Sequence, residues 1–251
     1  MLVMGGPPGH NRDMTDPGYG SPVHEALVDA LGTAIVQGDY APGARLATVE
    51  LAEQHGVSRS AAREVVRVLE TYGLVRVRRK AGVEVLPRSR WNVYAPEVLA
   101  WRLGGPDRAE QLRELGQLRS AVEPLAARLA AAAATPSQRE TLVASVVEMA
   151  RTEHVADSDE YLMADIRFHR TLLEASGNSM LATLSGVVES VLRGRTAHDL
   201  MPHDANPDAV RWHHDVAFAV ASGRGDEAAA AMTRIVAEAD QAMQAALADG
   251  R

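Results

Sequence analysis

Asp165, His169 and His213 have side chains that could bind a single cation. Asp165 and His169 are four residues apart within residues 161–175 (YLMADIRFHRTLLEA), so on a helix both would lie in the apolar stripe that contains Ile166. A carboxylate that faces a core is costly unless it has a strong partner. A carboxylate and an imidazole one helical turn apart can hold one metal ion, and His213 could supply a third ligand. The same spacing is equally consistent with an Asp–His hydrogen bond buried for packing and an ordinary core histidine.

A second set of candidate residues is positively charged. Residues 58–73 combine a serine at the N-cap position, Ser58, with a glycine after the last turn, Gly73, and an apolar face between them, which indicates a helix. The arginines of another face, each four residues from the last, are Arg59, Arg63 and Arg67.

A short basic hairpin follows this helix. Residues 74–78 (LVRVR) and 83–85 (VEV) have the pattern of strands, and the turn between them contains Arg79, Lys80 and Gly82. A cationic helix fits the major groove of DNA, and a basic ribbon beside it can reach phosphates or the minor groove. The helix and hairpin therefore predict a winged helix-turn-helix, and the alternative is a solvated surface helix that happens to be rich in arginine.

Two further helices, the second of them short, are expected before the arginine-rich helix. Ser21 and Pro22 form an N-cap and first-turn proline for a helix that ends near Gly38. Thr48 would cap a second helix that continues to His55. Three helices and a wing would then make up the N-terminal domain.

Beyond the hairpin the hydrophobic period is helical throughout. Breaks such as Thr135-Pro136 and Ser222-Gly223 divide this part into about six or seven helices, which predicts an antiparallel all-α bundle and a mainly α chain. The predicted order is a disordered tail (1–20), a winged helix-turn-helix DNA-binding domain (21–86), a linker (87–95) and a helical domain for effector binding and dimerisation (96–248).

Composition excludes several kinds of chemistry. The 251 residues include no cysteine, which rules out disulfides, thiolate zinc sites and cysteine nucleophiles, and the single lysine leaves no phosphate-binding P-loop. No apolar run has membrane length and no signal peptide is evident, so a cytoplasmic protein is expected. Residues 20–90 hold ten Lys and Arg against eight Asp and Glu, whereas residues 91–251 hold fifteen against twenty-three. The positive charge is therefore confined to the predicted DNA-binding domain.

Residues 31–87 resemble the DNA-binding domain of GntR-family bacterial regulators. The motifs that carry the resemblance include Pro42-Gly43, the run Gly56-Val57-Ser58-Arg59 and Gly73-Leu74, while Val49 and Glu84 depart from residues frequent in the family. The resemblance implies that Arg59 and Arg63 contact operator bases and backbone, and that the wing tip enters the minor groove. The predicted DNA-contacting residues are Ser58, Arg59, Ser60, Arg63, Arg67, Arg79, Lys80 and Gly82.

Residues 91–245 resemble the effector domain, called FCD, of the FadR-type branch of this family, on the motifs DIRFH (165–169) and ASGN (175–178) and on Arg119 with Glu123-Pro124. In many members an aspartate and three histidines hold a divalent metal of zinc, nickel or manganese type, which binds the carboxylate of the effector. Asp165, His169 and His213 match the first three ligands, and the fourth position is Ile235, which cannot coordinate. The resemblance implies either a metal on three protein ligands or direct hydrogen bonds from these side chains to the effector.

Arg119 and Arg193 are candidates to pair with an anionic effector, because a guanidinium matches a carboxylate in a bidentate fork. Either could instead be structural, with Arg119 paired to Glu123 four residues on. Residues 91–101 (WNVYAPEVLAW) are similar to a segment of the sugar-acid regulators of the galactonate-operon type. That resemblance implies a hexonate or a related sugar acid as effector.

Taken together, these patterns predict a homodimeric transcriptional repressor that its effector releases from an inverted-repeat operator. Two alternatives remain open from the sequence. One is a small metal-dependent enzyme in which Asp165, His169 and His213 activate a water. The other is a DNA-binding protein whose bundle binds no ligand and serves only for dimerisation.

Overall fold

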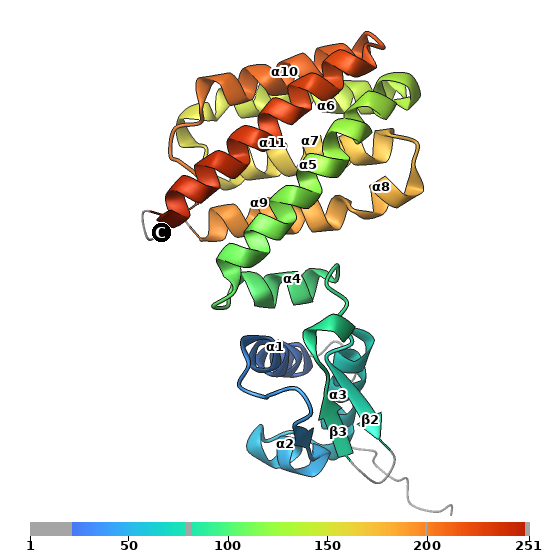
Figure 1. Cartoon of the computed structure of the whole chain (residues 1–251), viewed down its shortest axis with the longest axis vertical. Coiled ribbons are helices and arrows are strands. Elements are labelled where there is room, and N and C mark those ends of the chain that lie inside the picture. The colour runs from blue at the N-terminus through green and yellow to red at the C-terminus, as the bar shows by residue number, and fades with distance from the viewer. Residues whose placement is uncertain (1–21, 79–81, 199, 249–251) are drawn as a thin grey trace, which may run out of the picture. The chain divides into compact units, whose positions relative to one another are not determined.

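The computed structural model describes residues 22–78, 82–198 and 200–248. These residues form two compact units, which follow one another in the chain with the division between Trp91 and Asn92 (Figure 1). The predictions that lie outside the described residues are the tail 1–20, the N-cap Ser21 and the turn cations Arg79 and Lys80.

The first unit contains the predicted hairpin as β2 and β3, and a further strand that the sequence did not indicate makes it a three-stranded antiparallel sheet in the order β1-β3-β2. The additional strand pairs Arg45 with Glu84 and Leu46 with Val83. A strand of two residues carries no alternating pattern, which is why the sequence did not indicate it. The elements of this unit are α1 (Pro22–Gln37), β1 (Arg45–Leu46), α2 (Thr48–Gln54), α3 (Arg59–Thr71), β2 (Val75–Arg78), β3 (Gly82–Val85) and the 3-10 turn η1 (Arg88–Arg90).

The ends of α3 are fixed by the residues that the sequence indicated. The Ser58 hydroxyl accepts a hydrogen bond of 3.1 Å from the Ala61 amide, and Gly73 has φ 72°. A Cβ at Gly73 would lie 2.2 Å from the Arg90 carbonyl oxygen, so only glycine fits here. The predicted cap of α2 was wrong, because Thr48 is the first helical residue and the preceding alanine occupies the extended cap position without a side-chain hydrogen bond.

The second unit is an antiparallel helical bundle, as predicted, and it has eight α-helices within its described residues. The extra helix arises at Leu184, where a bend separates α8 from α9 without the glycine or proline that marks other breaks. The elements are α4 (Pro96–Leu103), α5 (Arg108–Ala133), α6 (Pro136–Arg151), the 3-10 turn η2 (Glu153–Val155), α7 (Asp159–Ala175), α8 (Ser179–Thr183), α9 (Ser185–Ala197), α10 (Pro207–Ala221) and α11 (Gly225–Ala248).

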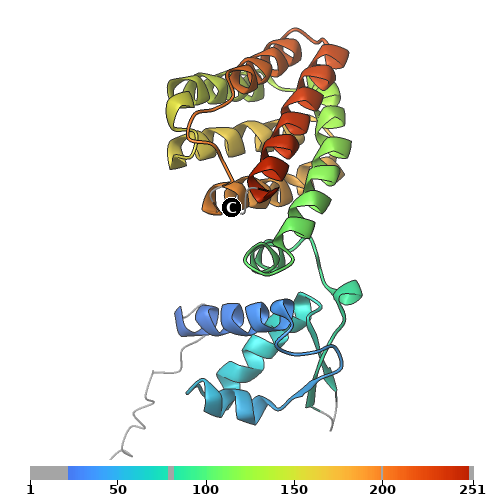
Figure 2. The ribbon, with the colours of Figure 1, turned by 60° about the vertical axis from the view of Figure 1, so that its left-hand side comes forward.

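Helix α7 is the central element of the bundle. It packs against α5, α6 and α9, while α11 lies alongside α5 and α10 (Figure 2). Phe168 and Leu172 of α7 are fully buried and join one apolar cluster with Met232 of α11. Because α7 is covered on several sides, polar side chains on it are also held in the interior. None of the described helices is long and apolar enough to cross a membrane.

Candidate functional site

Asp165, His169 and His213 converge inside the bundle. Asp165 and His169 come from α7 and His213 from α10, and all three are buried. Asp165 Oδ1 lies 3.2 Å from His169 Nε2 and 3.4 Å from His213 Nε2. One ligand atom from each residue lies within 4.8 Å of the others, which is the grouping that a metal ion requires.

Both histidines are oriented by a partner on the other ring nitrogen. His169 Nδ1 lies 2.6 Å from Glu123 Oε2, and His213 Nδ1 donates to the Ala209 carbonyl oxygen at 2.7 Å. Since a carbonyl only accepts, a neutral His213 carries its proton on Nδ1 and directs the lone pair of Nε2 towards Asp165. Metal-binding histidines typically have such a partner on the ring nitrogen that faces away from the metal.

The residues present fit a divalent metal. Asp165 Oδ1 and His213 Nε2 are buried, and neither has a well-formed hydrogen bond within the described residues. An imidazole lone pair and a carboxylate oxygen repel one another at this distance, and a cation or a proton between them removes the repulsion. Two imidazole nitrogens and one carboxylate oxygen suit zinc, nickel or manganese and leave positions for other ligands. Ile235, at the fourth family position, is buried beside the same cavity and offers only carbon atoms.

Buried charges surround the triad. Burial opposes ionisation of Glu123, but Arg119 and His169 outweigh it and lower the Glu123 pKa to about 2. Burial likewise opposes the charge of His169, but Glu123 and Asp165 raise the His169 pKa to about 9. The pKa of Asp165 is held well below its usual range, against burial, by His169 and His213. Both carboxylates are therefore ionised at neutral pH and attract a cation to this point.

A small cavity adjoins the triad. The space that the centre of a water molecule can occupy inside it is about 40 Å³. This is enough for an ion with a few waters. Besides the triad, the cavity is lined by Arg119, Tyr161, Arg195, Met201, Pro202, Ala205, Asn206, Ala209, Ile235, Glu238, Ala239 and Ala242.

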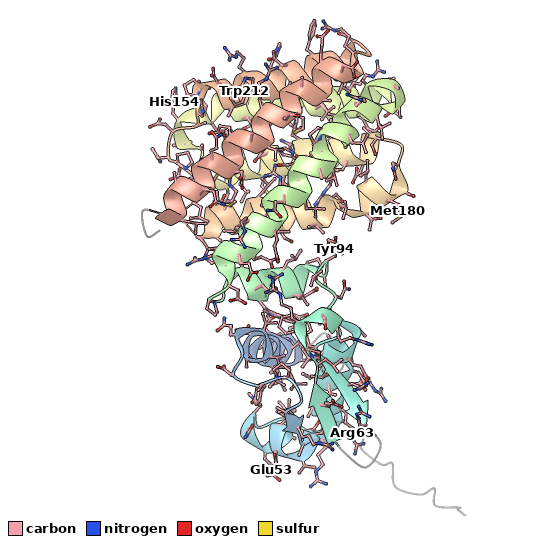
Figure 3. The ribbon with its side chains drawn as sticks, in the orientation of Figure 1. Glu53, Arg63, Tyr94, His154, Met180 and Trp212 are labelled. Atoms are coloured by element: carbon pink, nitrogen blue, oxygen red, sulfur yellow. The ribbon has the colours of Figure 1, made fainter. Side chains whose placement is uncertain are left out.

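Residues 200–206, between α9 and α10, form the roof of this cavity. The roof is held to η2 by two backbone hydrogen bonds of 2.7 Å, from Ala156 N to His203 O and from Ala205 N to Glu153 O. His203 Nδ1 also lies 3.0 Å from Asp157 Oδ1 on the surface. Figure 3 labels His154 of η2 on this edge of the bundle.

The two arginines predicted to pair with an anion, Arg119 and Arg193, have different positions, and a third arginine lies beside the cavity. Arg119 lines the cavity, but its Nε lies 2.6 Å from Glu123 Oε1. This is the structural ion pair that was the alternative to anion binding. Arg193 is half-exposed, pairs with Glu189 at 2.9 Å and does not line this cavity. Arg195, which the sequence analysis did not select, is buried and lines the cavity.

The predicted DNA-contacting residues of α3 lie on its outer surface. Ser60, Arg59, Arg63 and Arg67 are exposed, while the opposite face of the helix is buried. Figure 3 labels Arg63. Arg67 pairs with Glu64 at 2.7 Å, which leaves Arg59 and Arg63 as the less neutralised cations of the stripe. Ser58 is exposed but its hydroxyl is engaged as the N-cap.

The wing contributes further cations that the sequence analysis did not select. Arg76 and Arg78 lie on the same side of β2, and Glu84 of β3 binds both, at 3.3 and 2.5 Å. The residue that departs from the family pattern is therefore an internal partner that orients the wing arginines. Gly82 begins β3 with φ 80°.

Comparison with known proteins identifies both units. The model for "Bacterial regulatory proteins, gntR family" matches residues 23–85, and the model for the FCD domain matches residues 114–238. The Galactonate operon transcriptional repressor of Escherichia coli (strain K12) is 32% identical, over 88% of this chain and 96% of that protein. The HTH-type transcriptional regulator LutR of Bacillus subtilis (strain 168) is 31% identical, over 79% of this chain and 90% of that protein.

A solved structure supports the fold. Lar of Listeria monocytogenes has a TM-score of 0.54 at 18% sequence identity, and the match covers 90% of this chain and 99% of that one. At this identity the likeness shows a shared architecture.

Proposed function

Because this chain belongs to the GntR family of bacterial transcriptional regulators, in the branch with an FCD domain, we propose that it represses a sugar-acid catabolic operon and leaves its operator when a small carboxylate binds. Members of the family are DNA-binding transcriptional regulators and not enzymes, so the metal-dependent enzyme is set aside. The similarity to a galactonate-operon repressor supports a hexonate as the effector.

The observation that carries the proposal is the convergence of Asp165, His169 and His213 beside an interior cavity. These residues would hold a divalent metal, which when bound supplies open coordination positions for a carboxylate oxygen. Glu123 and the Ala209 carbonyl keep both Nε2 atoms directed at the ion. A bundle used only for dimerisation would have no need for buried polar atoms such as Asp165 Oδ1 and His213 Nε2 that lack a well-formed hydrogen bond in its core.

The DNA-binding half of the proposal assigns residues 21–86 to the operator and residues 96–248 to effector binding and dimerisation. Arg59 and Arg63 contact bases and phosphates, and the wing reaches the adjacent groove. A homodimer presents two copies of α3 to an inverted repeat, so half-site spacing controls affinity. The effector shifts the population of dimers away from the operator-competent spacing. The protein acts in the cytoplasm, where its operator is.

We infer that the roof moves when the effector enters the cavity. A volume of about 40 Å³ accepts an ion and waters but not the chain of a six-carbon sugar acid. Leu200, at the start of the roof, is buried in the core, whereas the residues after it are held to η2 by two backbone hydrogen bonds and by exposed contacts such as that of His203 with Asp157, which are weak enough to open.

The experiment that tests the proposal measures operator binding by fluorescence anisotropy with galactonate and other hexonates, with and without added metal. The wild type should release DNA with one acid, and Asp165→Ala should bind DNA equally well but fail to release it. Glu174→Ala, an exposed carboxylate on the same helix, is the matched control and should respond like the wild type. Normal release by Asp165→Ala would place the effector elsewhere.

A further inference from the structure

Arg195 differs from the other buried arginines of the bundle in having no carboxylate partner. Arg119 pairs with Glu123 at 2.6 Å, and Arg102 pairs with Glu114 at 3.0 Å. Arg195 is 6% exposed, and among the described residues its Nε makes no hydrogen bond and its guanidinium no ion pair. A guanidinium keeps its charge in proteins, so Arg195 is a buried cation that no described carboxylate contacts in an ion pair.

The surroundings of Arg195 make this charge costly for the ligand-free protein. The side chain comes from the last turn of α9 and lines the cavity together with Asp165 and Arg119. Burial and then repulsion by Arg119 lower the pKa of Arg195, although Asp165 and Glu238 act in the other direction. An uncompensated buried charge destabilises a fold, and an anion that entered the cavity would remove that cost.

We propose that Arg195 binds the carboxylate of the effector, so that this cavity accepts acids and rejects uncharged polyols of the same shape. The inference rests on the proposed function. The planar guanidinium can form two parallel hydrogen bonds with a carboxylate, a geometry that neither a lysine nor a metal alone supplies. Its contribution is separable from that of Asp165, His169 and His213, because Arg195 is not a metal ligand.

The test compares Arg195→Met with Arg193→Met by thermal unfolding, with galactonate and with galactitol, which has the same hydroxyl pattern without the carboxylate. Methionine keeps most of the apolar stem. Arg193 lies two residues earlier, is half-exposed and pairs with Glu189, so it is the matched control. A charge-assisted hydrogen bond predicts a loss of about 10- to 100-fold in galactonate affinity for Arg195→Met and no change for Arg193→Met.

Two further readouts separate this role from a structural one. Arg195→Met should bind metal like the wild type, and without ligand it should unfold at the same or a higher temperature, because an uncompensated charge has been removed. A structural arginine would instead lower that temperature. Arg195→Lys keeps the charge but not the fork, and it should lose less affinity than Arg195→Met.

The failures can be told apart. If no sugar acid stabilises the wild type, the proposed function is overturned. If galactonate stabilises the wild type and Arg195→Met equally, the proposed function stands and the role of Arg195 is wrong. Stabilisation of the wild type by galactitol as strong as that by galactonate would also overturn the inference.

Discussion

Replacement of Glu123 by glutamine tests whether the buried charges behind the metal site stabilise the bundle. Glu123 is fully buried, with Arg119 Nε and His169 Nδ1 each 2.6 Å from its oxygens. Its pKa of about 2, against 4.5 for an isolated glutamate, corresponds to about 3 kcal/mol in favour of the ionised form. We therefore expect Glu123→Gln to lower the free energy of unfolding by about 3 kcal/mol, close to the cost of removing one partner from a buried ion pair.

Urea unfolding followed by tryptophan fluorescence measures this loss, and its pH dependence tests the cause. The folded-state pKa of Glu123 is depressed, so its stabilisation is fully present above the unfolded pKa near 4.5 and is lost as the pH falls towards 2. The difference between wild type and variant should narrow between pH 4.5 and 2. It should also decrease as the pH rises from 6.5 towards 9, because Glu123 helps to raise the His169 pKa to about 9 and the stability from that proton is lost over this range.

Glu148→Gln is the control for this experiment. Glu148 pairs with Arg151 at 3.0 Å in the same bundle, but the arginine side chain is 71% exposed. An exposed pair contributes about 0 to 1 kcal/mol, so this variant should remain close to the wild type. If Glu123→Gln and Glu148→Gln are equally stable, the buried network does not stabilise the fold and the argument from the Glu123 pKa is refuted.

Three other predictions concern the metal, the DNA and the roof of the cavity. The metal must displace the proton of His169, whose pKa is raised to about 9. Metal affinity, measured by chelator competition, should therefore rise about tenfold for each pH unit between pH 6 and 8. An affinity independent of pH would contradict this. Arg63→Ala should weaken operator binding in a mobility-shift assay by about 5- to 150-fold and leave effector binding intact. Operator affinity equal to that of the wild type would show that Arg63 does not contact DNA. Asp157→Asn weakens the contact of 3.0 Å with His203 and should speed effector association in stopped-flow fluorescence, and an unchanged rate would mean that the roof does not limit access.

The features that the sequence predicted correctly depend on neighbours along the chain. The cap at Ser58 and the turn at Gly73 depend on local backbone geometry, which single residue types reveal. The shared face of Asp165 and His169 follows from the helical period alone. Strand β1 and the bend at Leu184 carry no such marker, because each is defined by the segments packed against it.

The choice between Arg193 and Arg195 shows how far the helical period can be taken. The two residues are separated by about 200° around a helix, so only one of them can face the core. Arg195 lies four residues after Val191 and three after Leu192, both buried, and therefore continues the apolar stripe of α9. This is the pattern that singled out Asp165 on α7, a charged residue within a core-facing stripe. Applied to α9, the same reasoning selects Arg195 from sequence alone. Which charged residues have a partner, and which do not, depends on helices distant in the chain and is visible only in the fold.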